Sequence, residues 1–262
     1  MKRRHTSLSI EGAVATLTLA RPDIRNAITG PEMLDEVVGT LDHPPPEVRI
    51  LIVTGQGTAF SAGGNVHEMG ERAGIFSGTP YQIAEAYRTT IQRLTRSVLS
   101  TDIVTIAAVN GPAVGAGFDL VLACDLRLGT SRAWFAHTFI DLGIIPGDGG
   151  AWLLPRVVGW QHAAEIAFTA RRVDADEAAD LDILLRVVEP DRLMETVSHL
   201  AADIAAKPAH SLRLTKRLLR HARSMDLEGF LELSAALQAM SHAEPEHEQA
   251  VERFLERWRT RD

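Results

Sequence analysis

The sequence predicts an α/β protein in which a core of alternating strands and helices is followed by a helical C-terminal region. Apolar runs of strand type alternate with segments of helical spacing as far as about residue 205, and from Pro190 onward almost every segment has helical spacing. We therefore expect two parts, residues 1–205 and 206–262. The 262-residue chain is 45% hydrophobic, which is enough for a substantial core.

Strand signals recur through the first part of the chain. Residues 6–20 alternate around Glu11-Gly12, which indicates a β-hairpin. Further strand-type runs lie at 48–53, 103–109, 125–129, 134–137 and 184–188.

Helical segments separate these strands. Pro31 stands near the first turn of an amphipathic segment that ends at Leu41, and Asp174 is a candidate N-cap for a helix through Ala178. Residues 73–80, with two glycines and a proline, indicate either a mobile loop or an ordinary surface loop. The other helices are expected at 66–72, 81–99, 116 onward, about 151 onward, 161–169, 193–206, 209–223, 227–242 and 245–259.

Two strand–glycine–helix junctions carry the strongest chemical signal. The first is residues 58–65, TAFSAGGN, after the run that ends at Thr54, and the second is residues 110–117, NGPAVGAG, after the run that ends at Val109. Glycine lets the backbone approach a ligand closely, and the first turn of the following helix has unpaired N–H groups and the positive end of the dipole. Two such loops can direct two N–H groups at one oxygen, which stabilises an enolate or another oxyanion.

The order of these motifs resembles the crotonase (enoyl-CoA hydratase/isomerase) superfamily. AFSAGGNVHEM and NGPAVGAGFDLVLACDLRL are similar to its two oxyanion motifs, and FAHTFIDLGIIPGDGG, LLPR and VG continue the match. The resemblance implies a right-handed spiral of ββα units that assembles into trimers, or dimers of trimers, through the helical region. It places the two oxyanion N–H groups on Gly64 and Ala116, where the family often has glycine at the second position.

The resemblance also implies a catalytic carboxylate at Asp119, about one helical turn beyond Ala116. An aspartate that only complements the helix dipole is the alternative interpretation. Typical hydratases have a second carboxylate, a Glu, where this chain has Phe139. Asp141 is our candidate replacement, and His137 lies equally close in sequence. The alternative interpretations are a structural aspartate near a turn and an ordinary histidine.

A third candidate is Asp148, in the turn Pro146-Gly147-Asp148-Gly149-Gly150. Related dienoyl-CoA isomerases place a catalytic aspartate at the position of Gly147, one residue earlier. Capping of the following helix explains Asp148 equally well.

The resemblance implies that the coenzyme A part of an acyl-CoA thioester binds near Arg25, Ala27, Ala62 and Gly64. An exposed loop arginine is the alternative interpretation of Arg25. Coenzyme A would be part of the substrate, and we expect no separate cofactor. No metal is expected either, because the residue four positions after His67 is a glutamate and the zinc motif is absent.

Composition limits the partners. The 27 basic and 34 acidic residues give a net charge of −7, which argues against binding to nucleic acid or to an anionic membrane. Cys124 is the single cysteine, which favours a reducing compartment, and the N-terminal stretch lacks the apolar region of a signal peptide. We expect a cytoplasmic protein.

Two hypotheses of function follow. The first is an enzyme that adds water to an enoyl-CoA, or moves its double bond, through a stabilised enolate; isomerisation is the close rival because one carboxylate is enough to move a proton. The second, suggested by Phe139, is a protein of the same fold that binds acyl-CoA with little catalysis.

Overall fold

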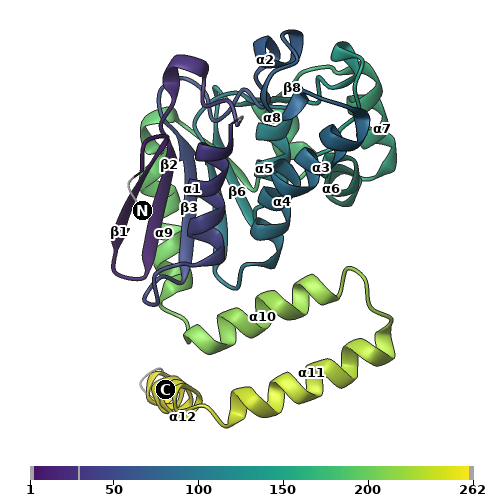
Figure 1. The fold of residues 1–262 in the computed structure, drawn as a ribbon. Coiled ribbons are helices and arrows are strands. Elements are labelled where there is room, and N and C mark those ends of the chain that lie inside the picture. The colour runs from purple at the N-terminus through teal and green to yellow at the C-terminus, as the bar shows by residue number, and fades with distance from the viewer. Residues whose placement is uncertain (1–2, 29, 260–262) are drawn as a thin grey trace.

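The structure is a computed structural model that describes residues 3–28 and 30–259 (Figure 1). It is an α/β fold with a helical C-terminal region, so the predicted fold class is confirmed. No helix among the described residues is long and apolar enough to span a membrane.

A six-stranded sheet with the order β1-β2-β3-β4-β6-β9 forms the core. The predicted hairpin is its edge, where β1 and β2 pair antiparallel with Thr6 opposite Leu19, and the other neighbours pair parallel. A second, three-stranded sheet has the order β5-β7-β8. The strands are Thr6–Glu11 (β1), Val14–Leu19 (β2), Ile50–Gly55 (β3), Val104–Val109 (β4), Ala113–Val114 (β5), Leu126–Thr130 (β6), Trp134–Ala136 (β7), Val173–Asp174 (β8) and Arg186–Val188 (β9).

Helices cover both faces of the large sheet. The α-helices are Pro31–Asp42 (α1), Val66–Gly70 (α2), Pro80–Thr89 (α3), Ile91–Ser100 (α4), Ala116–Ala123 (α5), Gly150–Val158 (α6), Trp160–Thr169 (α7), Ala175–Asp180 (α8), Leu193–Ala205 (α9), Ala209–His221 (α10), Leu227–His242 (α11) and Pro245–Arg259 (α12). Short 3-10 turns lie at Pro22–Ile24 (η1), Gly74–Phe76 (η2), Ile140–Leu142 (η3) and Pro190–Arg192 (η4).

Alternating side chains divide the core between the two faces of the sheet. Val53 and Ala107 belong to the large cluster that also contains residues of α1, α4 and α5, whereas Ile52 and Ile106 belong to a second cluster with α9. Successive residues of a strand point to opposite faces, so one apolar run supplies both clusters. The central strands are therefore buried on both sides, as their continuous apolar sequences indicate.

One helix prediction was wrong. The segment 81–99 is divided into α3 and α4 by Thr90, whose φ of −116° and ψ of −96° are not helical. The hydroxyl groups of Thr89 and Thr90 both donate to carbonyl groups of the preceding turn, Glu85 and Ala86. Such side-chain bonds to the backbone bend helices, and they explain the break.

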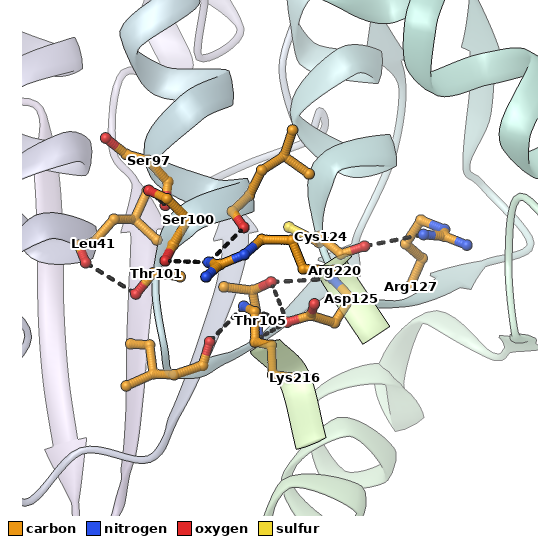
Figure 2. A network of polar contacts seen from close by, with 12 residues as sticks. Leu41, Ser97, Ser100, Thr101, Thr105, Cys124, Asp125, Arg127, Lys216 and Arg220 are labelled. Atoms are coloured by element: carbon orange, nitrogen blue, oxygen red, sulfur yellow. Dashed lines mark hydrogen bonds and ion pairs between the residues drawn. The ribbon is translucent and has the colours of Figure 1, made fainter. Parts of the chain in front are cut away.

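The C-terminal region is attached to the core through α10. The Lys216 ammonium donates to the Ile103 carbonyl at 2.6 Å and pairs with Asp125 at 2.7 Å, and Asp125 also accepts from the Thr105 amide. Figure 2 shows this network, with Arg220 reaching Ser100 beside it. None of the described residues of α11 and α12 is buried in the single chain. The division of the chain at residue 205 stays a prediction.

Candidate active site

The two glycine loops lie against each other. Ser61 forms an isolated parallel bridge with Ala113. The amides of Phe60 and Ser61 donate to the Pro112 carbonyl at 3.0 and 3.1 Å, and the Val114 amide donates back to Ser61 at 3.0 Å. These backbone bonds join segments about 50 residues apart in the sequence.

Close contact between the loops requires glycine. A Cβ atom on Gly63 would overlap the Val114 carbonyl oxygen and lie 3.0 Å from the Ala116 nitrogen. Gly63 also has a φ of +78°, which other residues rarely adopt. On the second loop, a Cβ on Gly117 would lie 2.6 Å from the Ser61 oxygen. The glycines thus allow the two loops to meet.

Gly64 and Ala116 line the same small cavity. Ala116 is the first residue of α5, where amides have no partner inside the helix. Among the described residues, neither amide has a hydrogen-bond acceptor. The structure therefore brings together the two residues that we expected to supply the oxyanion N–H groups.

The cavity is narrow and mainly apolar. Its volume is about 20 Å³, room for about one water molecule. An acyl chain can enter only if wall side chains such as Met69 and Phe76 move. The lining residues are Ile28, Gly64, Met69, Ile75, Phe76, Tyr87, Ile91, Ala116, Phe139, Ile144 and Asp148.

Asp119 lies in the first turn of α5 and is only 1% exposed. One carboxylate oxygen is 2.6 Å from Nε2 of His137, and the other accepts from the Gly150 amide at 3.0 Å. A Cβ on Gly150 would lie 2.6 Å from the carboxylate carbon, so only glycine leaves room for this arrangement. Both oxygens of Asp119 are thus held by N–H groups.

Asp148 is the carboxyl group among the residues that line the cavity. It is 6% exposed, and no described group donates a hydrogen bond to its carboxyl. Burial, together with the negative charge of Asp119, raises the pKa of Asp148 to about 7. The backbone holds its position, because the Asp148 carbonyl accepts from the Thr95 hydroxyl at 2.6 Å and the Gly147 carbonyl accepts from Gln92 at 2.9 Å.

Sequence comparison identifies the family. Residues 9–261 match a protein-family model described as enoyl-CoA hydratase/isomerase. The chain belongs to the enoyl-CoA hydratase/isomerase family. The crotonase superfamily expected from the two loops is therefore confirmed, and with it the prediction of an enoyl-CoA hydratase-like enzyme.

Similar proteins include more than one activity. The chain is 31% identical to the short-chain-enoyl-CoA hydratase of Clostridium acetobutylicum, over 98% of this chain and 97% of the relative. It is 30% identical to the 1,2-epoxyphenylacetyl-CoA isomerase of Escherichia coli, over 94% of this chain and 93% of the relative. A Thermobifida fusca structure in complex with acetoacetyl-CoA is 35% identical, with a TM-score of 0.83 over 91% of this chain and 95% of that one.

Phe139 and Asp141 occupy different positions relative to the cavity of this family member. The Phe139 ring lines the cavity, where typical hydratases have glutamate. Asp141 is exposed in η3 and is not among the described residues that line the cavity. Its catalytic role stays a prediction. Asp148, the third candidate from the sequence, lines the cavity, whereas Asp141 does not.

The residues that we expected to contact coenzyme A lie beside the first glycine loop, residues 58–65. The Arg25 carbonyl accepts from the Ala62 amide at 2.9 Å, and the Ile28 amide donates to Gly63 at 2.7 Å. The Arg25 side chain is exposed, whereas Ala27 is buried. The structure thus brings Arg25, Ala27, Ala62 and Gly64 into one region; their contact with coenzyme A stays a prediction.

Sequence reasoning missed the side chains that hold this region together. The buried Asn26 amide donates to the carbonyls of Gln56 and Ala59, both at 2.9 Å, and the Ser61 hydroxyl donates to the Asn26 carbonyl at 2.8 Å. Asn26 also has a positive φ of 54°. Asparagine adopts this conformation more readily than most residues. The asparagine in the segment RPDIRNAI was therefore the sequence signal that could have indicated this turn.

A much larger cavity lies elsewhere. It has a volume of about 780 Å³, lies between α10 and the core, and includes neither glycine loop among its lining residues. The Cys124 thiol lies at this cavity, and burial raises its pKa to about 12. A thiol with that pKa is a poor nucleophile. No group of three metal-ligating side chains is found among the described residues.

Proposed function

We propose that the protein hydrates enoyl-CoA thioesters, with the thioester oxygen bound by the amides of Gly64 and Ala116 and with Asp119 and Asp148 as the carboxyl pair. One observation carries this proposal. Asp148, with a pKa of about 7, lies at the cavity that Gly64 and Ala116 line, and the buried Asp119 lies close enough for its charge to raise that pKa. Titratable pairs whose environments separate their pKa values are the usual acid and base partners.

The chemistry follows from charge. Addition of water to the β carbon of an enoyl thioester places negative charge on the thioester oxygen, where two preorganised N–H groups stabilise it. Proton transfer to the α carbon then needs an acid, and activation of water needs a base. Asp148 delivers its proton to the α carbon through one carboxyl oxygen and takes a proton from the water through the other, while ionised Asp119 supplies the neighbouring negative charge. The second carboxyl group thus comes from Asp148 rather than from the position of Phe139.

Isomerisation of the double bond is the second candidate. Both oxygens of Asp119 are engaged by N–H groups, so Asp148 is the carboxyl group at the cavity itself. A single group suffices to remove and return a proton beside a stabilised enolate. The Escherichia coli relative is named as an isomerase of an epoxide thioester, so an isomerase is found among the proteins similar to this chain.

Incubation with crotonyl-CoA and with a longer 2-enoyl-CoA in deuterated water distinguishes the candidates. The 3-hydroxyacyl product supports hydration, and deuterium incorporation or double-bond migration without that product supports isomerisation. Binding with neither reaction would support the alternative of an acyl-CoA-binding protein and overturn both enzymatic candidates.

A pair of matched variants tests the assignment of the acid. Asp148→Asn should lower kcat at least 100-fold, in line with the usual contribution of a general acid. Asp141→Asn, at an exposed position seven residues earlier, should leave kcat unchanged. If the Asp141 variant loses activity and the Asp148 variant keeps it, the assignment is wrong.

We further propose that the coenzyme A part of the substrate binds along Arg25, Ala27, Ala62 and Gly64, without a separate cofactor. The complex of the Thermobifida fusca structure with acetoacetyl-CoA supports this class of ligand. The exposed Arg25 side chain can meet a phosphate. Arg25→Ala should therefore raise KM for the CoA thioester and leave kcat unchanged, and an unchanged KM would remove Arg25 from the site.

Assembly into a homotrimer, or a dimer of trimers, is also proposed. Large apolar side chains of α11 and α12 are exposed in the single chain, including Leu227, Leu231, Phe254 and Trp258. Association would cover them. Light scattering on the purified protein gives the number of subunits. The cytoplasmic location, expected from the single cysteine and from the N-terminal stretch, stays a prediction.

A further inference from the structure

His137 is a buried side chain to which the proposed chemistry assigns no role. It follows β7 directly and is 1% exposed. Its Nε2 atom lies 2.6 Å from the Asp119 carboxylate, and its Nδ1 atom has no hydrogen-bond partner among the described residues. The rings of Phe118 and Phe139 contact the imidazole edge to face, with centroids at 5.0 and 5.4 Å. The imidazole therefore has one polar contact, and that contact is Asp119.

The short distance defines the position of one proton. A carboxylate is only an acceptor, so an imidazole nitrogen at 2.6 Å from Asp119 must carry the hydrogen. Nε2 of His137 is therefore the donor, whatever the state of Nδ1. Since Phe118 and Phe139 flank the ring, the imidazole has little freedom to turn away.

We infer that His137 is a positioning residue for proton transfer: its Nε2–H holds the Asp119 carboxylate in its place beside Asp148. The inference rests on the proposed function. It adds a residue that acts without touching the substrate and that bonds the Asp119 oxygen not used by the Gly150 amide.

The number of donors explains why one histidine can matter. Asp119 is buried, and its described donors are the His137 imidazole and the Gly150 amide. Removal of one donor leaves one oxygen of a buried carboxylate without its partner, so the carboxylate loses the bond that fixes its position. The negative charge beside Asp148 is then displaced, and the group that acts at the cavity is affected.

Two variants at this position separate the donor from the bulk of the side chain. His137→Leu fills the space between Phe118 and Phe139 with an apolar group and removes the N–H. His137→Gln retains an N–H donor of similar reach. Both remove the imidazole, so any difference between them reports the hydrogen bond to Asp119. His162→Leu, at an exposed histidine of α7, is the control for a general effect of the substitution.

The expected result is a fall in kcat of at least tenfold for His137→Leu, because displacement of a reacting group by about 1 Å can lower the rate about 100-fold. KM should change less than about twofold, since the imidazole is not among the lining residues of the cavity. His137→Gln should recover kcat to within about threefold of the parent chain. A kcat for His137→Leu equal to that of His162→Leu would overturn the inference, and so would a His137→Gln variant as impaired as His137→Leu.

A measurement on the unliganded protein separates this inference from the proposed function. A proton shared in a short N–H to carboxylate hydrogen bond resonates far downfield in proton NMR. The parent chain should show such a resonance, and both His137→Gln and Asp119→Asn should remove it. If the resonance is present but the chain converts no acyl-CoA, the proposed function fails while the hydrogen bond stands. If the resonance is absent, or survives Asp119→Asn, the inference itself is wrong.

Discussion

Replacement of Asp148 by asparagine should remove a pH dependence of the protein's stability. In the folded protein, burial and the charge of Asp119 raise the pKa of Asp148 to about 7, whereas the ordinary value is 3.8. Between these two values the folded state holds a proton that the unfolded state has released. The free energy of unfolding therefore falls as the pH rises through this range, because ionised Asp148 is tolerated better in the unfolded chain.

The size of the effect follows from the shift in pKa. The difference between about 7 and 3.8 is about 3 units, and each unit corresponds to 1.36 kcal/mol. Full titration of Asp148 thus lowers the free energy of unfolding of the parent chain by on the order of 4 kcal/mol, a large fraction of its typical total. Asparagine does not titrate, so the stability of Asp148→Asn lacks this contribution at every pH.

Urea denaturation of both proteins between about pH 4.5 and pH 8 measures the difference. The parent chain should lose stability relative to Asp148→Asn as the pH rises, with most of the change complete slightly above pH 7. Asp141→Asn, which alters an exposed aspartate of η3, should follow the parent chain. Parallel curves for the parent and Asp148→Asn would refute the assignment of a buried, proton-bearing aspartate at the cavity.

Two further predictions concern steric fit and a buried charge. Gly150→Ala should push the Asp119 carboxylate out of place, lowering kcat about 100-fold and the free energy of unfolding by about 1–3 kcal/mol. Gly39→Ala, in α1 with open space around it, is the control and should stabilise the protein slightly. Equal effects of the two substitutions on kcat would contradict this explanation. Lys216→Ala should cost about 1–3 kcal/mol in thermal or urea unfolding because the Ile103 carbonyl and the partly exposed Asp125 carboxylate lose the buried ammonium group that donates to them. Lys207→Ala should change stability by less than about 0.5 kcal/mol, and a similar loss for both lysines would show that the ion pair is not the cause.

Local patterns were sufficient for much of the fold. The alternation in residues 6–20 and the helical spacing after Pro190 report the period of each element directly, and the observed hairpin and C-terminal helices agree with them. The division of 81–99 at Thr90 was not predictable, because both halves keep helical spacing and the break depends on where two threonine hydroxyls bond to the backbone.

The sequence by itself determined the family and the two glycine loops, because glycines at 63 and 117 and the motif order are properties of the chain. Only the tertiary structure decided which polar groups meet. Asp141 and Asp148 are equivalent as residue types in one loop, yet one is exposed and the other buried at the cavity. The pKa of a carboxyl group and its partners depend on burial and on charges brought close by folding, and neither is a function of position along the chain.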